Sequence, residues 1–94
     1  MAQLFIQHKV KDYPKWKSMF DEHGAKRKAA GSKGGRHFRS EKDPNEVVIL
    51  FEWEDLGKAH KFAESEDLRQ TMERAGVVRK PEIHFLDEIG KFTV

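Results

Sequence analysis

Hydrophobic and polar side chains alternate in several parts of the chain, and this period of two predicts β-strands. Residues 4–10 place two sets on opposite faces: Leu4, Ile6, His8 and Val10 against Phe5, Gln7 and Lys9. Residues 82–89 (EIHFLDEI) alternate in the same way. Residues 47–53 (VVILFEW) are apolar on both faces, which predicts a strand covered on both sides. Residues 36–41 (RHFRSE) predict a short strand that joins this one through the turn KDPNE.

A spacing of three or four residues predicts a helix from Asp12 to about Ala30. Asp12 is a suitable N-cap, Pro14 fits a first turn, and Gly31 ends the helix. One side of this helix carries an aromatic and basic stripe: Tyr13, Trp16, Phe20, His23 and Arg27.

A second helical region follows Glu54 and Asp55 and carries Ala59, Phe62 and Ala63. Ser65 begins a further turn or helix that ends at Gly76, with apolar residues at core spacing: Leu68, Met72 and Ala75.

The predicted order βαββαβ indicates an α+β protein with the ferredoxin-like arrangement, a four-stranded antiparallel sheet with its helices on one face. The 94 residues predict a single domain, 1–94. Helices on one face leave the other face uncovered, and the strand 47–53 is apolar there as well. We therefore expect the uncovered face to pack on a second copy in a two-fold homodimer.

The composition indicates the class of protein and its expected location. The chain is 37% apolar and 36% charged, which is typical of a globular protein. It has no cysteine, and no apolar run has the length of a signal peptide or a membrane span. We therefore expect a cytoplasmic protein without a membrane partner.

Positive charge gathers in residues 26–39, where six lysines and arginines occur with no acid, and GSKGGRH lies inside this segment. A phosphate-binding loop needs a strand before it and a helix N-terminus after it. Here the order is reversed, because the glycines follow the end of a helix. We interpret residues 31–35 as a helix stop and a flexible connection, which leaves open a mobile loop at a pocket mouth.

Nucleic acid is a second interpretation, because the RNA-recognition motif has the same βαββαβ order. LFIQHK places Phe5 at a stacking position of that motif, and the basic segment offers phosphate contacts. EVVILFEW argues against it, because Val48 and Leu50 stand where stacking aromatics are needed. Aliphatic side chains on that face fit burial better.

The remaining chemistry lies in histidines and aromatics. Five histidines are scattered without the spacing of a metal site: His8, His23, His37, His60 and His84. His23 shares the aromatic helix stripe, so its imidazole is predicted to point between helix and sheet. The aromatics Trp16, Phe20, Trp53 and Phe62 either fill the core, which their helical and strand spacing favours, or line a cavity. The polar groups of His23, Arg27 and His8 on the same faces argue for the cavity.

Read end to end, the chain resembles the antibiotic biosynthesis monooxygenase type of dimeric α/β barrel. The likeness rests on VVILFEWEDLGKAHKFAESEDLRQTMERAGV and the closing EIHFLDEI. In that family an apolar third strand ends in Trp and acidic residues, and an Ala and Phe helix, a Ser-x-x-Leu turn and a final strand follow. The resemblance implies a homodimer formed through the sheets, with a small-molecule pocket in each subunit.

Members described as monooxygenases oxidise aromatic, polyketide-like phenols without metal or flavin, so the resemblance implies no cofactor. It implies His23 as base or hydrogen-bond partner and Arg27 as the group that stabilises a phenolate. The expected substrate-binding residues are Trp16, Phe20, His8, Trp53, Phe62 and Met72.

Other members of the same barrel keep alternatives open: a non-catalytic ligand-binding or stress-responsive barrel, or a polyketide cyclase. Haem-degrading relatives use an Asn, a Trp and a His where this chain has Gln7 or His8, Phe62 and Met72. These three differences argue against haem degradation, although His60 or His23 remains available to ligate iron from another position.

Overall fold

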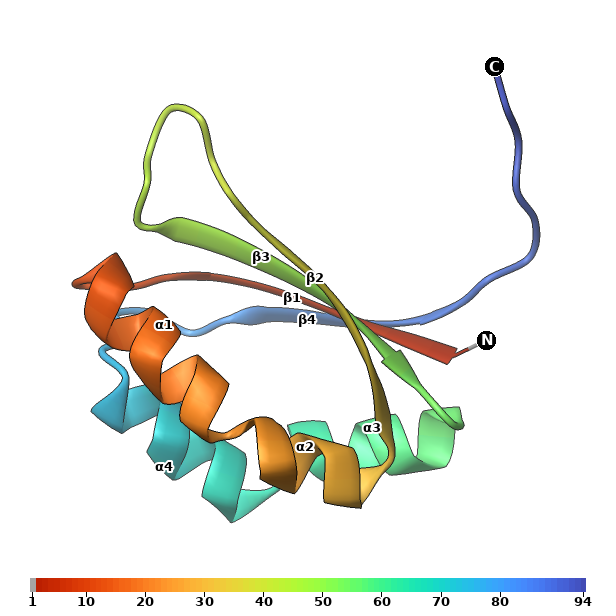
Figure 1. Ribbon diagram of the computed structural model, residues 1–94, viewed down its shortest axis with the longest axis horizontal. Coiled ribbons are helices and arrows are strands. Elements are labelled where there is room, and N and C mark those ends of the chain that lie inside the picture. The colour runs from red at the N-terminus through yellow and green to blue at the C-terminus, as the bar shows by residue number, and fades with distance from the viewer. Residues whose placement is uncertain (1) are drawn as a thin grey trace.

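The structure, a computed structural model, describes residues 2–94, which form four strands and four helices (Figure 1). In chain order they are β1 (Ala2–Lys9), α1 (Tyr13–Glu22), α2 (Gly24–Ala30), β2 (Ser32–Arg39), β3 (Glu46–Trp53), α3 (Leu56–Ala63), α4 (Glu66–Arg74) and β4 (Glu82–Asp87). None of the helices in the described chain combines the length and apolar character needed to span a bilayer.

The strands form one antiparallel sheet in the order β2-β3-β1-β4, and the helices lie along one face of it (Figure 1). This confirms the predicted α+β, ferredoxin-like arrangement. Each predicted helical region supplies a pair of helices, α1 with α2 and α3 with α4. We call the covered side of the sheet the inner face and the opposite side the outer face.

The inner face holds the core, because the strands place alternate residues there. Leu4 pairs with Phe51 and Ile6 with Ile49 across β1 and β3, and all four are buried. Trp16 of α1 and Phe62 of α3 close over them. The alternation read from residues 4–10 and 47–53 is therefore confirmed on this face.

The first helical region was expected to be one helix to about Ala30, and this expectation is wrong. The helix breaks at His23, which is the C-cap of α1 and the N-cap of α2. Gly24 follows the break, and glycine has low helix propensity. The predicted cap and stop are confirmed: the Asp12 carboxylate accepts from the backbone N–H of Lys15, and Gly31 has φ 115°.

The segment GSKGGRH is a strand start and not the flexible connection that we expected. β2 begins at Ser32, four residues before the predicted start, and ends at Arg39 instead of residue 41. Ser32 pairs with Trp53 and Gly34 with Glu52, so Lys33 is one extra residue in a β-bulge. A side chain at Gly35 would collide with the carbonyl oxygen of Leu50. The glycines that we expected to form a loop are therefore part of β2 and pair closely with β3.

The predicted turn between β2 and β3 is confirmed, whereas the predicted end of β4 is not. In the hairpin turn, Glu46 N–H donates to the carbonyl of Asp43 at 3.0 Å, as the sequence KDPNE predicts. β4 ends at Asp87, not at residue 89, because Asp87 already lies opposite Ala2 at the beginning of β1. Residues 88–94 extend away from the body (Figure 1), with Ile89 and Phe92 almost fully exposed.

The outer face carries apolar side chains that no helix of residues 2–94 covers (Figure 1). Phe5 lies opposite Leu50, and Val48 lies opposite Phe38. Phe38 and Leu86 are 48% and 41% exposed. β3 is thus apolar on both faces, but residues 2–94 cover only one of them.

Candidate functional site

A small cavity of about 40 Å³ lies between the inner face and the helices. Its walls come from β1, β3, both helices of the first pair, and α3 and α4. Seven of the predicted site residues line it: His8, Trp16, Phe20, His23, Arg27, Phe62 and Met72. The structure therefore brings together side chains that are up to 64 positions apart in the sequence.

Trp53 is the predicted site residue that does not line this cavity. Its ring packs on Phe62 with centroids 4.9 Å apart, and the residue is fully buried at the end of β3. The strand alternation puts it on the same face as Phe51, but Phe51 lies nearer the middle of the strand and takes the cavity position. Sequence reasoning gave Phe51 no role in the site.

Four Trp and Phe side chains line the cavity: Trp16, Phe20, Phe51 and Phe62. Trp16 and Phe20 are stacked with centroids 4.9 Å apart, and Phe20 approaches Phe51 at 6.2 Å. Phe51 and Phe62 meet edge to face at 6.0 Å. Such rings bind flat apolar ligands by dispersion and stacking.

His8 is the most unusual polar group in the cavity. It is 2% exposed, and neither ring nitrogen has a hydrogen-bond partner in residues 2–94. Trp16 meets its ring edge to face at 5.7 Å. Burial lowers the pKa of His8 to about 4, and the charge of Glu46 offsets this only in part. The imidazole is therefore neutral at pH 7 and presents one donor and one acceptor.

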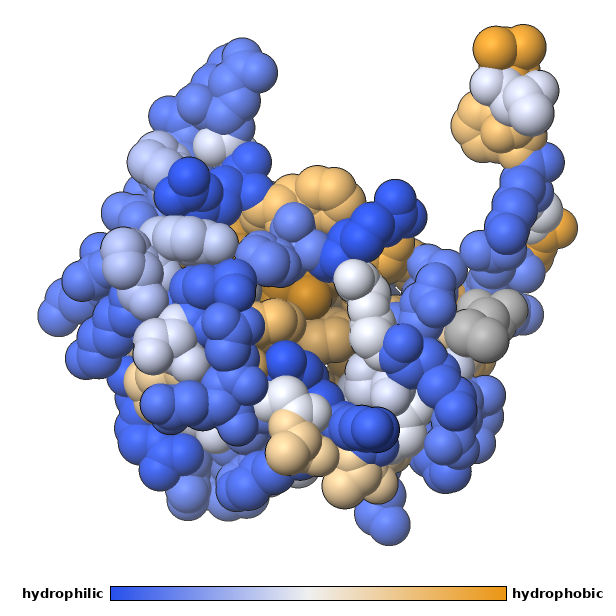
Figure 2. Space-filling view, in the orientation of Figure 1, coloured by the Kyte–Doolittle hydropathy of each residue, from blue (hydrophilic) through white to orange (hydrophobic). Residues whose placement is uncertain are grey.

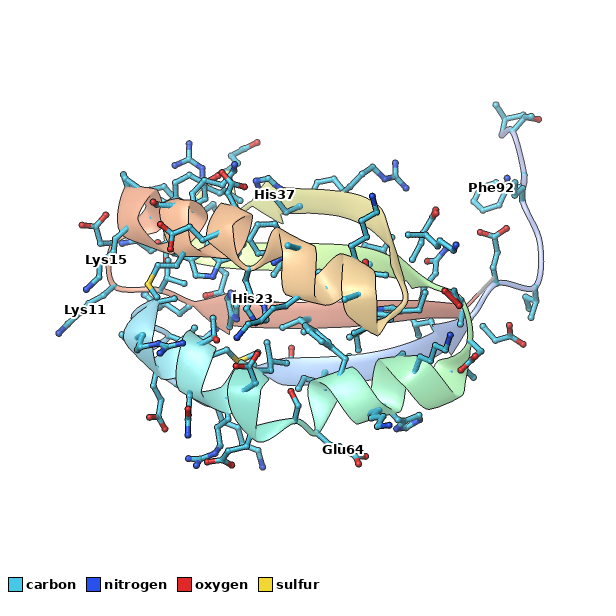
Figure 3. The ribbon with its side chains drawn as sticks, turned by 60° about the horizontal axis from the view of Figure 1, so that its bottom comes forward. Lys11, Lys15, His23, His37, Glu64 and Phe92 are labelled. Carbon is cyan, nitrogen blue, oxygen red and sulfur yellow. The ribbon has the colours of Figure 1, made fainter. Side chains whose placement is uncertain are left out.

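His23 reaches the same cavity from the break between α1 and α2, and Figure 3 shows it between the two helix pairs. Its Nε2 lies 2.9 Å from a carboxylate oxygen of Asp67 in α4. The other oxygen of Asp67 accepts from Lys26 at 3.2 Å. The hydrogen bond from His23, followed by that from Lys26, lowers the pKa of Asp67. An ionised carboxylate only accepts, so Nε2 carries a hydrogen, and the neutral form of this imidazole has its lone pair on Nδ1.

Asp67 is a site residue that sequence reasoning missed. The stretch SEDL is explained locally as the start of α4, where Ser65 accepts from Leu68 N–H and acids suit the first turn. Asp67 lies 44 positions from His23, and only the packing of α4 beside the first helix pair brings them together. No sequence signal distinguishes it from its neighbour Glu66.

Arg27 forms the boundary of the cavity. Its guanidinium carbon lies 3.8 Å from the centre of the Phe20 ring, and Nη1 donates to the carbonyl of Phe20 at 2.8 Å. Burial lowers the pKa of Arg27, and the charge of Asp21 opposes this shift. No carboxylate within residues 2–94 forms an ion pair with it.

A second hollow, of about 140 Å³, adjoins the cavity along β2, and we call it the β2 hollow. Phe20, Arg27 and Phe51 line both spaces. His37, another residue that sequence reasoning left without a role, lines the β2 hollow and lies 3.3 Å from the hydroxyl of Tyr13. Figure 2 shows an apolar floor in a hollow beside β2, with hydrophilic residues around it.

No group of three histidine, aspartate or glutamate side chains within residues 2–94 is arranged to hold a metal ion.

Solved structures share this architecture, although no family model or curated sequence matches the chain. Solved structures match over nearly the whole length. One titled antibiotic biosynthesis monooxygenase has a TM-score of 0.71 and 17% identity, covering 96% of this chain and 100% of its own.

Two further structures show the same arrangement. SnoaB of Streptomyces nogalater, titled a cofactor-independent oxygenase, has a TM-score of 0.77 and 13% identity, covering 96% of this chain and 94% of its own. A conserved protein from Methanosarcina mazei Go1 has a TM-score of 0.73 and 13% identity, covering 94% and 92%. At such identities the shared property is the backbone architecture. The chain therefore has the fold of the antibiotic biosynthesis monooxygenases.

Proposed function

We propose that the cavity binds a flat aromatic ligand, and that His23 acts as the base in its oxygenation by O₂ without a cofactor. The observation that carries this proposal is that two imidazoles with different hydrogen bonding line one aromatic cavity. The ring of His23 is oriented by Asp67, whereas the ring of His8 is buried with both nitrogens unpartnered. The likeness to SnoaB, a cofactor-independent oxygenase, supports it at the level of the fold.

The proposed reaction converts a methylene that lies between phenolic rings into a carbonyl. Nδ1 of His23 takes a proton, and the resulting carbanion passes one electron to O₂. The two radicals join through a new C–O bond, and the peroxide takes the proton back from His23. Loss of the second C–H proton and cleavage of the O–O bond release water. The balance is CH₂ + O₂ → C=O + H₂O, so oxygen is the only oxidant.

The other residues hold the ligand in this proposal. Trp16 and Phe20 stack on its rings, Phe62 and Met72 close the far wall, and His8 hydrogen-bonds a phenolic oxygen. Arg27 stabilises the phenolate. A cavity of about 40 Å³ has room for water molecules but not for a ring system. Binding therefore requires Arg27 to move and join the cavity to the β2 hollow.

The test is oxygen uptake with 1,8-dihydroxyanthrone, measured above the rate in buffer, with the quinone product followed by absorbance. We expect His23→Ala to lower the enzymatic rate by about 10²-fold, the usual contribution of a general base. Asp67→Asn leaves the imidazole without its carboxylate and is expected to have a smaller effect in the same direction. The matched control is His60→Ala, because His60 is half exposed on α3 and does not line the cavity.

An uptake rate that His23→Ala leaves unchanged would contradict the assignment of the base. Binding of the anthrone, seen by quenching of tryptophan fluorescence, without oxygen uptake would instead favour the non-catalytic ligand-binding barrel.

We also propose that the outer face is covered by a second copy of the chain. Phe5, Val48 and Leu50 form an apolar patch that continues to Phe38 and Leu86. Light scattering on a sizing column should give twice the chain mass across a dilution series. Leu50→Glu should give the single mass, because it would bury an unpaired carboxylate at the contact. Leu56→Glu, the same change on an exposed leucine of α3, should leave the dimer intact.

A wild-type monomer would contradict this proposal and make salt-dependent RNA binding by Phe5 the next test.

A further inference from the structure

A third hollow, of about 530 Å³, opens beside the β2 hollow on the side of α2, and we call it the basic hollow. Its walls combine α2 with the β-bulge of β2 and with Glu54, which follows β3. Arg27 lines the cavity, the β2 hollow and the basic hollow. Its side chain is therefore the wall that these three spaces share.

The charge of the basic hollow is unbalanced. Three cationic side chains, Arg27, Lys28 and Lys33, face a single carboxylate, Glu54. Nζ of Lys58 already lies 2.6 Å from Glu54 and holds it in an ion pair. Within residues 2–94, none of the three cations forms an ion pair of its own. The hollow thus carries positive charge without a matching protein anion.

Arg27 has the donors to bind an oxyanion there. A guanidinium has about five N–H donors, and the protein engages one of them, through Nη1 and the carbonyl of Phe20. Gly24 leaves space beside this group, since a Cβ at that position would lie 3.5 Å from Nη2. Once it leaves the Phe20 ring, the flat guanidinium can bind a carboxylate with two parallel hydrogen bonds.

The β-bulge keeps the approach open. Gly34 has φ 102°, a conformation that side-chain-bearing residues rarely adopt, and a Cβ there would meet nothing within 4 Å. The extra residue of the bulge, Lys33, is one of the three cations that line the hollow. The same irregularity of β2 thus leaves the entrance clear and supplies a charge at its edge.

We propose that the basic hollow binds the anionic group of the ligand whose rings occupy the cavity, so that the ligand is a flat aromatic that carries an oxyanion. This inference rests on the proposed function, because it uses the same cavity for the rings. Arg27 leaves Phe20 to pair with the oxyanion, and that movement joins the three spaces. Lys28 and Lys33 attract the charge to the entrance.

The test compares two fluorescent probes with one ring skeleton. 8-Anilinonaphthalene-1-sulfonate carries an anionic group, and N-phenyl-1-naphthylamine lacks it. Lys28→Gln and Lys33→Gln should each weaken sulfonate binding about threefold, as expected for one exposed charge. Arg27→Gln should weaken it about tenfold or more, the size of a charged hydrogen bond. Neither lysine variant should change binding of the neutral probe by more than about twofold.

Lys15→Gln is the matched control, because Lys15 is exposed on α1 and lines none of the three spaces (Figure 3). It removes the same charge and should leave both probes unaffected. Displacement of the sulfonate probe by benzoate or by inorganic phosphate then distinguishes a carboxylate ligand from a phosphate ligand.

Two results would overturn the inference while the proposed function stands: lysine variants that match Lys15→Gln, or variants that weaken both probes equally. Failure of both probes to bind the wild-type protein would instead contradict the ligand cavity itself, and with it the proposed function.

Discussion

The two faces of the sheet are built from alternate residues of the same strands, yet they leave different groups unsatisfied. On the inner face the core apolar groups are covered, and the imidazole of His8 has no hydrogen-bond partner among residues 2–94. On the outer face the polar side chain of Gln7 has a partner, Glu46 at 3.1 Å, while Leu50 is only partly covered and Phe38 is exposed. What each face lacks indicates what it can bind: a polar aromatic ligand inside, and an apolar protein surface outside.

The largest expected effect separates two leucines that occupy opposite faces. Leu4 is fully buried on the inner face, and we expect Leu4→Ala to lower the free energy of unfolding by about 3 to 4 kcal/mol. Leu50→Ala should lower it by about 1 kcal/mol in the monomer, because part of that side chain is already exposed. Urea unfolding at one low protein concentration measures both. Equal losses would mean that the outer face is as well covered as the inner face.

The second effect is a dependence of stability on pH that comes from the inner face alone. His8 has its pKa lowered to about 4, so between pH 4 and 6.5 the unfolded chain binds a proton that the folded chain does not. Stability therefore rises with pH through this window, and is lost as pH falls. Over the whole window the loss amounts to about 3 kcal/mol.

Urea midpoints at several pH values, compared with those of His8→Gln, measure this contribution. The variant should lose less stability on acidification, whereas His60→Gln, which changes an exposed histidine, should follow the wild type. A His8→Gln curve parallel to the wild type would show that the His8 ring is hydrated in solution.

The smallest effect compares neighbouring polar residues and has opposite signs on the two faces. Gln7→Ala removes a hydrogen bond on the outer face and should destabilise by about 1 kcal/mol. His8→Leu replaces an unpartnered buried imidazole with an apolar side chain and should stabilise by about 1 kcal/mol at pH 7. Thermal unfolding of the two variants tests this difference, and destabilisation by His8→Leu would show that the imidazole has a partner after all.

Much of the fold could be read from the sequence, because burial repeats every second residue in β1 and β3. The caps Asp12 and Ser65 and the stop Gly31 could be identified from residue type, because their chemistry is local. The helix break at His23 escaped prediction for a physical reason. The aromatic stripe continues across it from Phe20 to Arg27, and a short break does not disturb that spacing.

The sequence predicts a site residue where helix or strand periodicity determines the direction of its side chain. It does not predict one that only tertiary packing brings to the site. Phe20 and His23 share a helix stripe, and Met72 has core spacing, so periodicity places them near the cavity. The same periodicity places Trp53 on the inner face. However, Trp53 is the last residue of β3 and lies beyond the part of the strand that lines the cavity. Asp67 reaches His23 only through the packing of two helix pairs, which no local pattern encodes.

The extra residue in the β-bulge also bears on how the chain tolerates insertions and deletions. Removing Lys33 would make Ser32 and Gly34 consecutive, so that they pair regularly with Trp53 and Glu52 of β3. Arg36–Arg39 would keep their present register on β3. Deleting Arg36 would instead turn His37 outward and Phe38 inward. Length changes at the bulge alter the charge and width of the basic hollow without disturbing the sheet. Related chains could therefore change the proposed ligand preference at this position at little cost to the sheet.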